Sequence, residues 1–128
     1  MSMERVHTEA NGYPTDPFLL TVTREGAPHC SPVPVQWAGD LLLVPAPRHW
    51  TQNPPESRGT SPAQPVCVLY PPAGGDGYSL VIDGTTVDTG PTLTVTVTRA
   101  VLHRRGHPED ASTGSGCRSD CIPLVPEG

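Results

Sequence analysis

Short apolar and β-branched runs alternate with turn-forming residues along most of the chain. Runs in which apolar and polar positions alternate with a period of two are typical of half-buried strands, and Gly and Pro mark the turns between them. No segment shows a long apolar repeat of helical period. The pattern therefore predicts an all-β, six-stranded antiparallel barrel, with strands at residues 18–23, 29–37, 41–44, 65–70, 78–83 continuing to 88, and 93–103.

Three of these predicted strands carry special positions. In residues 29–37, Pro32 and Pro34 are two positions apart, so their missing N–H donors point to the same side and predict either an exposed edge strand or a strand that bulges at a pocket. Asp83-Gly84 interrupts its strand as a turn or bulge signal. The continuous apolar run Leu41–Val44 predicts burial on both faces.

The composition varies enough along the chain to divide it into three parts. Residues 1–16 are polar, and Pro14 and Pro17 make a long helix improbable, so we expect a loose N-terminal arm. Residues 17–105 would form the barrel, including a proline-rich loop at 45–64 with at most one helical turn near Trp50–Asn53. Residues 106–128 are rich in Gly, Ser and Pro and predict a flexible tail that carries a cysteine pair.

Composition limits the possible functions. The chain has 128 residues, which is the length of one domain. Because 17 of them are prolines and 13 are glycines, we expect only a modest hydrophobic core. All eight basic residues are Arg, which excludes a lysine Schiff base within this chain. A formal net charge of -5 without a basic cluster argues against a nucleic-acid partner.

Neither a secretory signal nor an apolar run of about 20 residues, the length that spans a bilayer, is evident in the sequence. We therefore expect a cytoplasmic protein with no membrane partner, whose four cysteines are mostly reduced.

The order of several motifs resembles a known family. Thr21–His29 is a strand, a charged Gly turn and the start of a second strand; Ser31–Val35, Trp37–Val44, Val66–Tyr70 and Tyr78–Gly84 follow in order. This set, within about residues 17–104, resembles the pyridoxamine 5'-phosphate oxidase-like split β-barrel family. The resemblance implies a split barrel of Greek-key type, FMN or the deazaflavin F420 as cofactor, a homodimer, and oxidoreductase chemistry on a small organic substrate.

The resemblance also implies which residues hold the cofactor. Ser31 and Val33, on the second strand, would contact the ring, while Arg48, Thr51 and Asn53 would hold the phosphate. Trp50 would stack on the ring or a substrate, or would cap the surface instead. The helix that usually follows the Asn is replaced here by the segment 54–62, which removes a source of backbone donors for phosphate.

No catalytic acid or base is evident, since His29 and His49 are candidates only by location and are more simply solvated loop residues. Cys30 and Cys67 lie on predicted strands, where small buried side chains are expected.

Four residues near the C-terminus have the side chains that zinc prefers. His103, His107, Cys117 and Cys121 offer two imidazoles and two thiols, but the spacing is not that of a zinc finger. A disulfide between Cys117 and Cys121 or a plain tail are the other interpretations.

Three functions remain open from the sequence. The first is a flavin- or deazaflavin-dependent oxidoreductase. The second is a non-catalytic split barrel with a degraded cofactor site that serves as a binding module. The third is a metal- or redox-responsive protein that uses the C-terminal Cys/His cluster.

Overall fold

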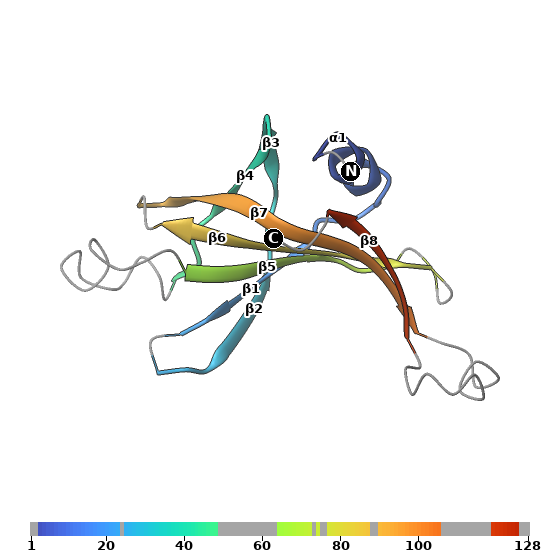
Figure 1. The fold of residues 1–128 in the computed structure, drawn as a ribbon. Helices are drawn as coiled ribbons and strands as arrows, with labels where there is room; N and C mark the ends of the chain where they lie inside the picture. Colours follow the sequence, from blue (N-terminus) through green and yellow to red (C-terminus); the bar gives the residue numbers. More distant parts are fainter. Residues whose placement is uncertain are drawn as a thin grey trace.

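A computed structural model describes residues 3–23, 25–48, 64–72, 74, 77–87, 90–105 and 119–125. These residues form one helix and eight strands (Figure 1): α1 (Met3–Asn11), β1 (Phe18–Val22), β2 (Pro28–Pro32), β3 (Gln36–Ala38), β4 (Leu41–Pro45), β5 (Gln64–Tyr70), β6 (Ser79–Val87), β7 (Thr92–Arg105) and β8 (Ser119–Val125). The part of the chain described here contains no helix with the length and apolarity needed to cross a bilayer. The expectation of an all-β, antiparallel, barrel-like fold is confirmed.

All eight strands belong to one antiparallel sheet that curls into a half-barrel. Its order is β2-β1-β5-β6-β7-β4-β3, and β8 pairs with β7. The two edge strands β2 and β3 are consecutive in the chain and are joined by residues 33–35. Three residues reach only about 10 Å, so the sheet must curl until its two edges meet at this linker. Away from the linker, the hairpins β1–β2 and β3–β4 splay apart (Figure 1).

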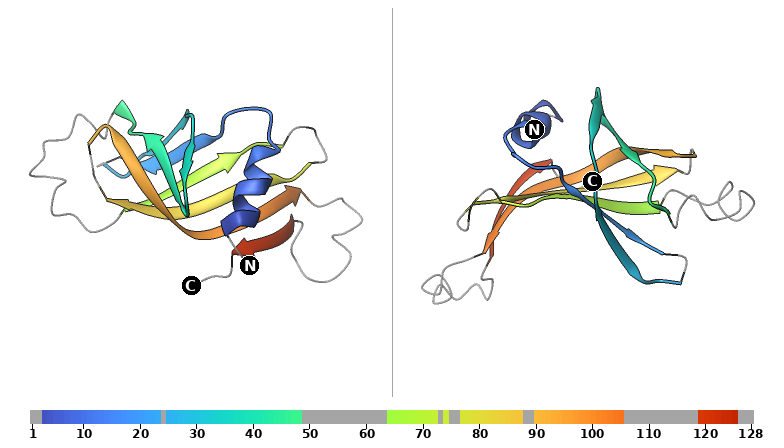
Figure 2. Two further views of the ribbon diagram at one scale, coloured as in Figure 1. Left: turned by 90° about the horizontal axis from the view of Figure 1, so that it is seen from above. Right: turned by 180° about the vertical axis from the view of Figure 1, so that it is seen from behind.

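The long strand β7 determines where the remaining elements dock. One side of β7 pairs with β6 along most of its length, from the partners Ser79↔His103 to Val87↔Thr94. On its other side the first half pairs with β4 and the second half with β8. Figure 2 shows α1 lying across the sheet beside β8, and the two elements are in contact.

The core lies on the face of the sheet that α1 covers. Val6 and Ala10 of α1 are buried against strand residues that alternate along each strand, as period-two burial requires. The largest fully buried side chains are Leu19, Leu42, Leu80, Ile82, Leu93 and Leu124. Thr21 and Thr86 are buried polar residues within this core.

Two details of the strand predictions are confirmed. The pairing of β6 with β7 shifts its register between Asp83 and Gly84, as expected for a β-bulge. Among the described strands β2 pairs only with β1, so it is an edge strand, and the missing N–H donors of Pro28 and Pro32 do not interrupt hydrogen bonding inside the sheet.

Other expectations were wrong. The predicted loose arm contains α1, because the prolines at 14 and 17 lie beyond its end and do not interrupt it. The predicted strand 29–37 is two strands, divided where the linker crosses between the sheet edges. β4 is not buried on both faces: Leu42 and Val44 are buried, whereas Leu41 and Leu43 are half-buried.

The predicted flexible tail is also partly wrong. β8 forms within it, because β7 extends past β4 and offers its free edge to a further strand. The predicted turn near Trp50–Asn53 and the rest of the tail lie outside the described residues.

Candidate functional site

Ser31 and Val33 lie where the two sheet edges meet. Ser31 is near the end of β2, is half-buried, and is paired with Leu19 of β1. Val33 begins the linker; its side chain is 6% exposed, and its N–H donates a hydrogen bond to the carbonyl oxygen of Pro17 at 2.9 Å. This bond and the burial fix the end of β2 against the start of β1. We call the region of residues 31–35 the closed end of the half-barrel.

Arg48 projects from the chain just beyond β4 and is exposed. Two residues earlier, the N–H of Ala46 donates to the carbonyl oxygen of Pro91 at 2.8 Å, which ties this segment to the start of β7. In the β3–β4 hairpin Gln36 pairs with Leu43, so the end of β4 lies beside the start of β3 and its linker. Through the sheet register, Ser31 lies level with Ala100 of β7. The last residue of β4 pairs with Thr92 at the start of β7, so strand pairing does not bring Arg48 level with the closed end.

The remaining predicted cofactor residues cannot be placed. Trp50, Thr51 and Asn53, like His49, lie outside the described residues. His29 is half-buried on β2, opposite Thr21, so it is not a solvated loop residue. The described part of the expected phosphate site is Arg48.

Aromatic side chains form a cluster between α1 and the sheet, at the border of the core, and the sequence analysis missed it. The Trp37 ring of β3 stacks on His7 of α1, with centroids 4.8 Å apart and planes inclined by 21°. Tyr70 of β5 accepts a hydrogen bond from Trp37 and lies 5.4 Å from the Tyr13 ring. The Tyr13 hydroxyl in turn donates to the carbonyl oxygen of Tyr78 at 2.7 Å.

This aromatic cluster joins α1, β3, β5 and the segments that flank β1 and β6. Burial raises the pKa of Tyr70, while the hydrogen bond from Trp37 acts in the opposite direction. All three tyrosines of the chain belong to the cluster. The positions of the tyrosines in the sequence do not indicate that they lie close together in the fold. The small number of aromatic residues was the one feature that could have drawn attention to them.

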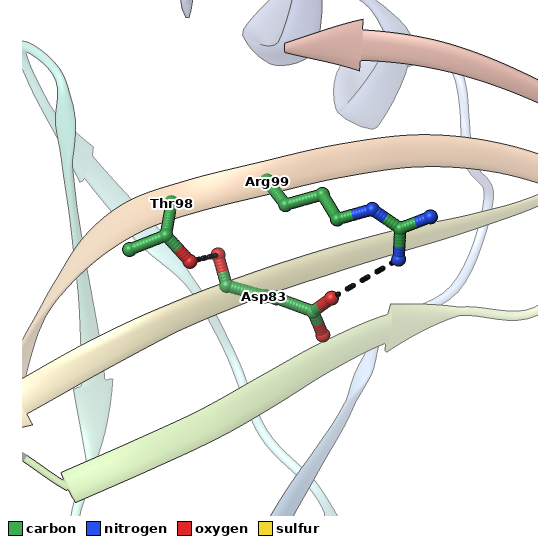
Figure 3. Close-up of polar contacts among 3 residues, drawn as sticks. All are labelled: Asp83, Thr98 and Arg99. Atoms are coloured by element: carbon green, nitrogen blue, oxygen red, sulfur yellow. Dashed lines mark hydrogen bonds and ion pairs between the residues drawn. The ribbon is translucent and has the colours of Figure 1, made fainter. Parts of the chain in front are cut away.

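The opposite, outer face of the sheet carries a polar group around Asp83. The Arg99 guanidinium lies 3.5 Å from the Asp83 carboxylate, and the Thr98 hydroxyl donates to the Asp83 carbonyl oxygen at 3.2 Å (Figure 3). Cys67 of β5 is the direct cross-strand partner of Asp83. Burial, the nearby Asp83 carboxylate and a hydrogen bond to it raise the pKa of Cys67 to about 12. Cys67 is therefore a poor nucleophile at neutral pH.

Cys67 should resist alkylation at pH 8, whereas the exposed Cys30 should react readily. The substitution Asp83→Asn removes the charge and should increase the rate at Cys67 without changing that at Cys30. Mass spectrometry of iodoacetamide-treated peptides measures both rates, and equal rates in the native protein would contradict this account. The folded state favours the neutral Cys67 thiol, because its pKa is about 12 there and 9.0 in the unfolded chain. The contribution of this thiol to the free energy of unfolding should therefore be present below about pH 9 and be lost as the pH rises to about 12.

The other cysteines and the metal candidates are only partly described. Cys30 is exposed, not buried, because β2 is an edge strand and this side chain lies on the outer face. His103 and Cys121 are direct cross-strand partners on β7 and β8, and Cys121 is a free thiol. His107 and Cys117 lie outside the described residues. Within the described ranges there is no group of three or more potential metal ligands.

Comparison with known proteins gives relatives without a stated activity. The chain is 38% identical over 64 residues to an uncharacterised protein of Mycobacterium bovis and equally to one of Mycobacterium tuberculosis. The match covers 44% of this chain and 45% of each relative, so it spans less than half of their length. No protein-family model matches the chain, and no solved structure matches it.

Proposed function

We propose that the closed end of the half-barrel, together with Arg48, binds FMN or the deazaflavin F420, and that the protein is an oxidoreductase acting on a small organic substrate. The observation that carries the proposal is the antiparallel half-barrel itself, on which Ser31 and Val33 lie where the two sheet edges meet and Arg48 is exposed just beyond β4. The resemblance between the ordered strand motifs and the pyridoxamine 5'-phosphate oxidase-like family supports it further.

The chemical groups of Ser31, Val33 and Arg48 suit an anionic cofactor with a planar ring. The Arg48 guanidinium has a planar fork of donors that can hold two phosphate oxygens at once. The Ser31 hydroxyl can donate to or accept from a ring heteroatom, and Val33 supports this strand from within the core. Bound flavin would supply the hydride or electron transfer, and this chain would supply binding, orientation and an environment shielded from water.

The proposal includes a homodimer in a cytoplasmic, reducing setting. On the outer face a row of apolar side chains crosses neighbouring strands, because Phe18 pairs with Leu69 and Leu69 with Val81. All three are half-buried and do not belong to the core. A small domain with one modest core gains stability by covering such a surface with a second copy.

Replacing Arg48 with alanine tests the phosphate contact. Loss of a charge-assisted hydrogen bond costs about 1.5–3 kcal/mol, so the Kd for FMN should rise by about 10- to 150-fold. Fluorescence quenching of FMN measures the change. Arg5→Ala removes the same charge from the exposed side of α1 and should leave the Kd unchanged.

Equal Kd values for Arg48→Ala and the wild-type chain would remove Arg48 from the site. If the wild-type chain binds neither FMN nor F420, the oxidoreductase proposal is wrong, and a non-catalytic binding module becomes the better interpretation.

A further inference from the structure

An open pocket lies on the α1 side of the sheet, between the end of α1, the turn near residue 77 and β7. Its volume is about 400 Å³, within the range of small-molecule sites. None of Ser31, Val33 and Arg48 is among its lining residues, which are Glu9, Gly12, Tyr13, Gly74, Gly77, Tyr78 and Leu102.

Glu9 supplies the charge of this pocket. It lies in the last turn of α1, which contains no basic residue. Helix carbonyl groups carry partial negative charge at this end, so a carboxylate here is unfavourable for the helix alone. The Glu9 carboxylate also acts on its neighbour: after burial, its negative charge is the second cause that raises the pKa of Tyr13. The carboxylate and the helix end together make this side of the pocket attractive to a cation.

The other walls are aromatic and apolar, and they are held in place. The Tyr13 hydroxyl is hydrogen-bonded to the Tyr78 carbonyl oxygen, which fixes the two tyrosine segments relative to each other. The Arg104 guanidinium lies over the Tyr78 ring, 4.8 Å from its centroid, so a cation already occupies one face of this ring, and a second cation would have to lie on the Glu9 and Tyr13 side of the pocket. Leu102 of β7 is 7% exposed and adds an apolar side chain to the pocket wall.

We propose that this pocket binds a small organic cation, namely an ammonium group carried on a short aromatic or apolar body. The ammonium would lie against the Glu9 carboxylate, and the body would lie between the tyrosine side chains and Leu102. A carboxylate beside aromatic rings is the combination that recognises an amine by charge and by cation–π attraction. This site is additional to the proposed flavin site, and neither depends on the other.

Titration of the full chain with three probes of similar size tests the charge requirement. Phenethylamine is the cation, 2-phenylethanol the neutral analogue and 3-phenylpropanoate the anion. Chemical-shift changes in two-dimensional NMR spectra should show saturable binding of phenethylamine, with the largest changes at Tyr13 and Tyr78. The affinity for phenethylamine should be at least about 10-fold higher than that for 2-phenylethanol, which corresponds to about 1.4 kcal/mol of charge interaction. The carboxylate probe should not bind.

Glu9→Gln keeps the size of the side chain and removes its charge, and it should reduce the affinity for phenethylamine to that for the alcohol. The variant should fold at least as well as the wild type, because it removes a negative charge from a helix C-terminus. Glu4→Gln removes the same charge from the first turn of α1, outside the pocket, and should leave the affinity unchanged.

Three results would overturn the proposal: no saturable binding of phenethylamine, equal affinities for the amine and the alcohol, or an unchanged affinity in Glu9→Gln. FMN titration of Glu9→Gln should match the wild type, so a failure of this site can be distinguished from a failure of the flavin site.

Discussion

Gly84→Ala should reduce the free energy of unfolding by about 3 kcal/mol, near the upper end of typical overpacking costs. Gly84 lies at the bulge of β6. A Cβ atom at this position would be 2.6 Å from the backbone oxygen of Thr96 and 2.6 Å from a side-chain carbon of Val95, distances that real Cβ atoms essentially never show. Because one of these atoms belongs to the backbone of β7, the strand pair itself must shift to make room. Urea unfolding followed by circular dichroism measures the loss as a lower midpoint.

Gly74→Ala is the matched control for this prediction. A Cβ atom at Gly74 would meet no atom of the described residues within 4 Å, and its backbone φ lies outside the left-handed region. The control should change stability by no more than about 0.5 kcal/mol. If Gly84→Ala were as stable as Gly74→Ala, β6 and β7 could not approach each other as described.

Leu42→Ala should cost about 2–5 kcal/mol, the range measured for removing a large buried aliphatic side chain. Leu42 is fully buried on β4 and belongs to the core that joins this strand to α1 and to β7. Its neighbour Leu43 points to the other face and is only half-buried. Leu43→Ala should therefore cost markedly less, and the two variants differ only in which face of the strand they affect.

The urea midpoints of the two variants measure this difference when both have the same slope of the free energy of unfolding against urea concentration. Equal losses for Leu42→Ala and Leu43→Ala would contradict the one-sided burial of β4. They would instead favour the continuous apolar run of the sequence, which had predicted burial on both faces.

The strands of this protein could be predicted because their signals are local. Alternating residues such as Leu19 and Thr21, or Leu80 and Ile82, point to one face, and this periodicity is visible in the sequence. Gly84 marked the bulge for a similarly local reason, since glycine within a strand often permits a close approach of another backbone. The edge position of β2 followed from Pro32, which cannot donate to a neighbouring strand.

The helix was missed because the prolines at 14 and 17 argue against a long helix, although Val6 and Ala10 lie four positions apart on one helix face. The last strand could not be predicted because tertiary packing determines it. β8 includes Pro123, and it forms because β7 extends beyond β4 and leaves an edge to be paired. The free edge of β7 that β8 pairs with cannot be recognised from the sequence of residues 119–125 itself.

The candidate site divides in the same way. Ser31, Val33 and Arg48 were identified through motifs in sequence order, and their places at the end of β2, in the linker and just beyond β4 follow from the local strand pattern. The aromatic cluster and the Glu9 pocket arise from contacts such as that between Tyr13 and Tyr78, which are 65 positions apart. Contacts of this length depend on how the sheet curls, which no local pattern encodes.

Titration of the purified full chain with FMN and with F420, followed by fluorescence, tests the central proposal most directly. The proposal predicts saturable binding of at least one of the two, with a Kd of about 1 μM, which corresponds to about 8 kcal/mol of binding free energy. A chain that is purified without flavin and quenches neither cofactor at saturating protein would contradict the proposed function, whatever the fold.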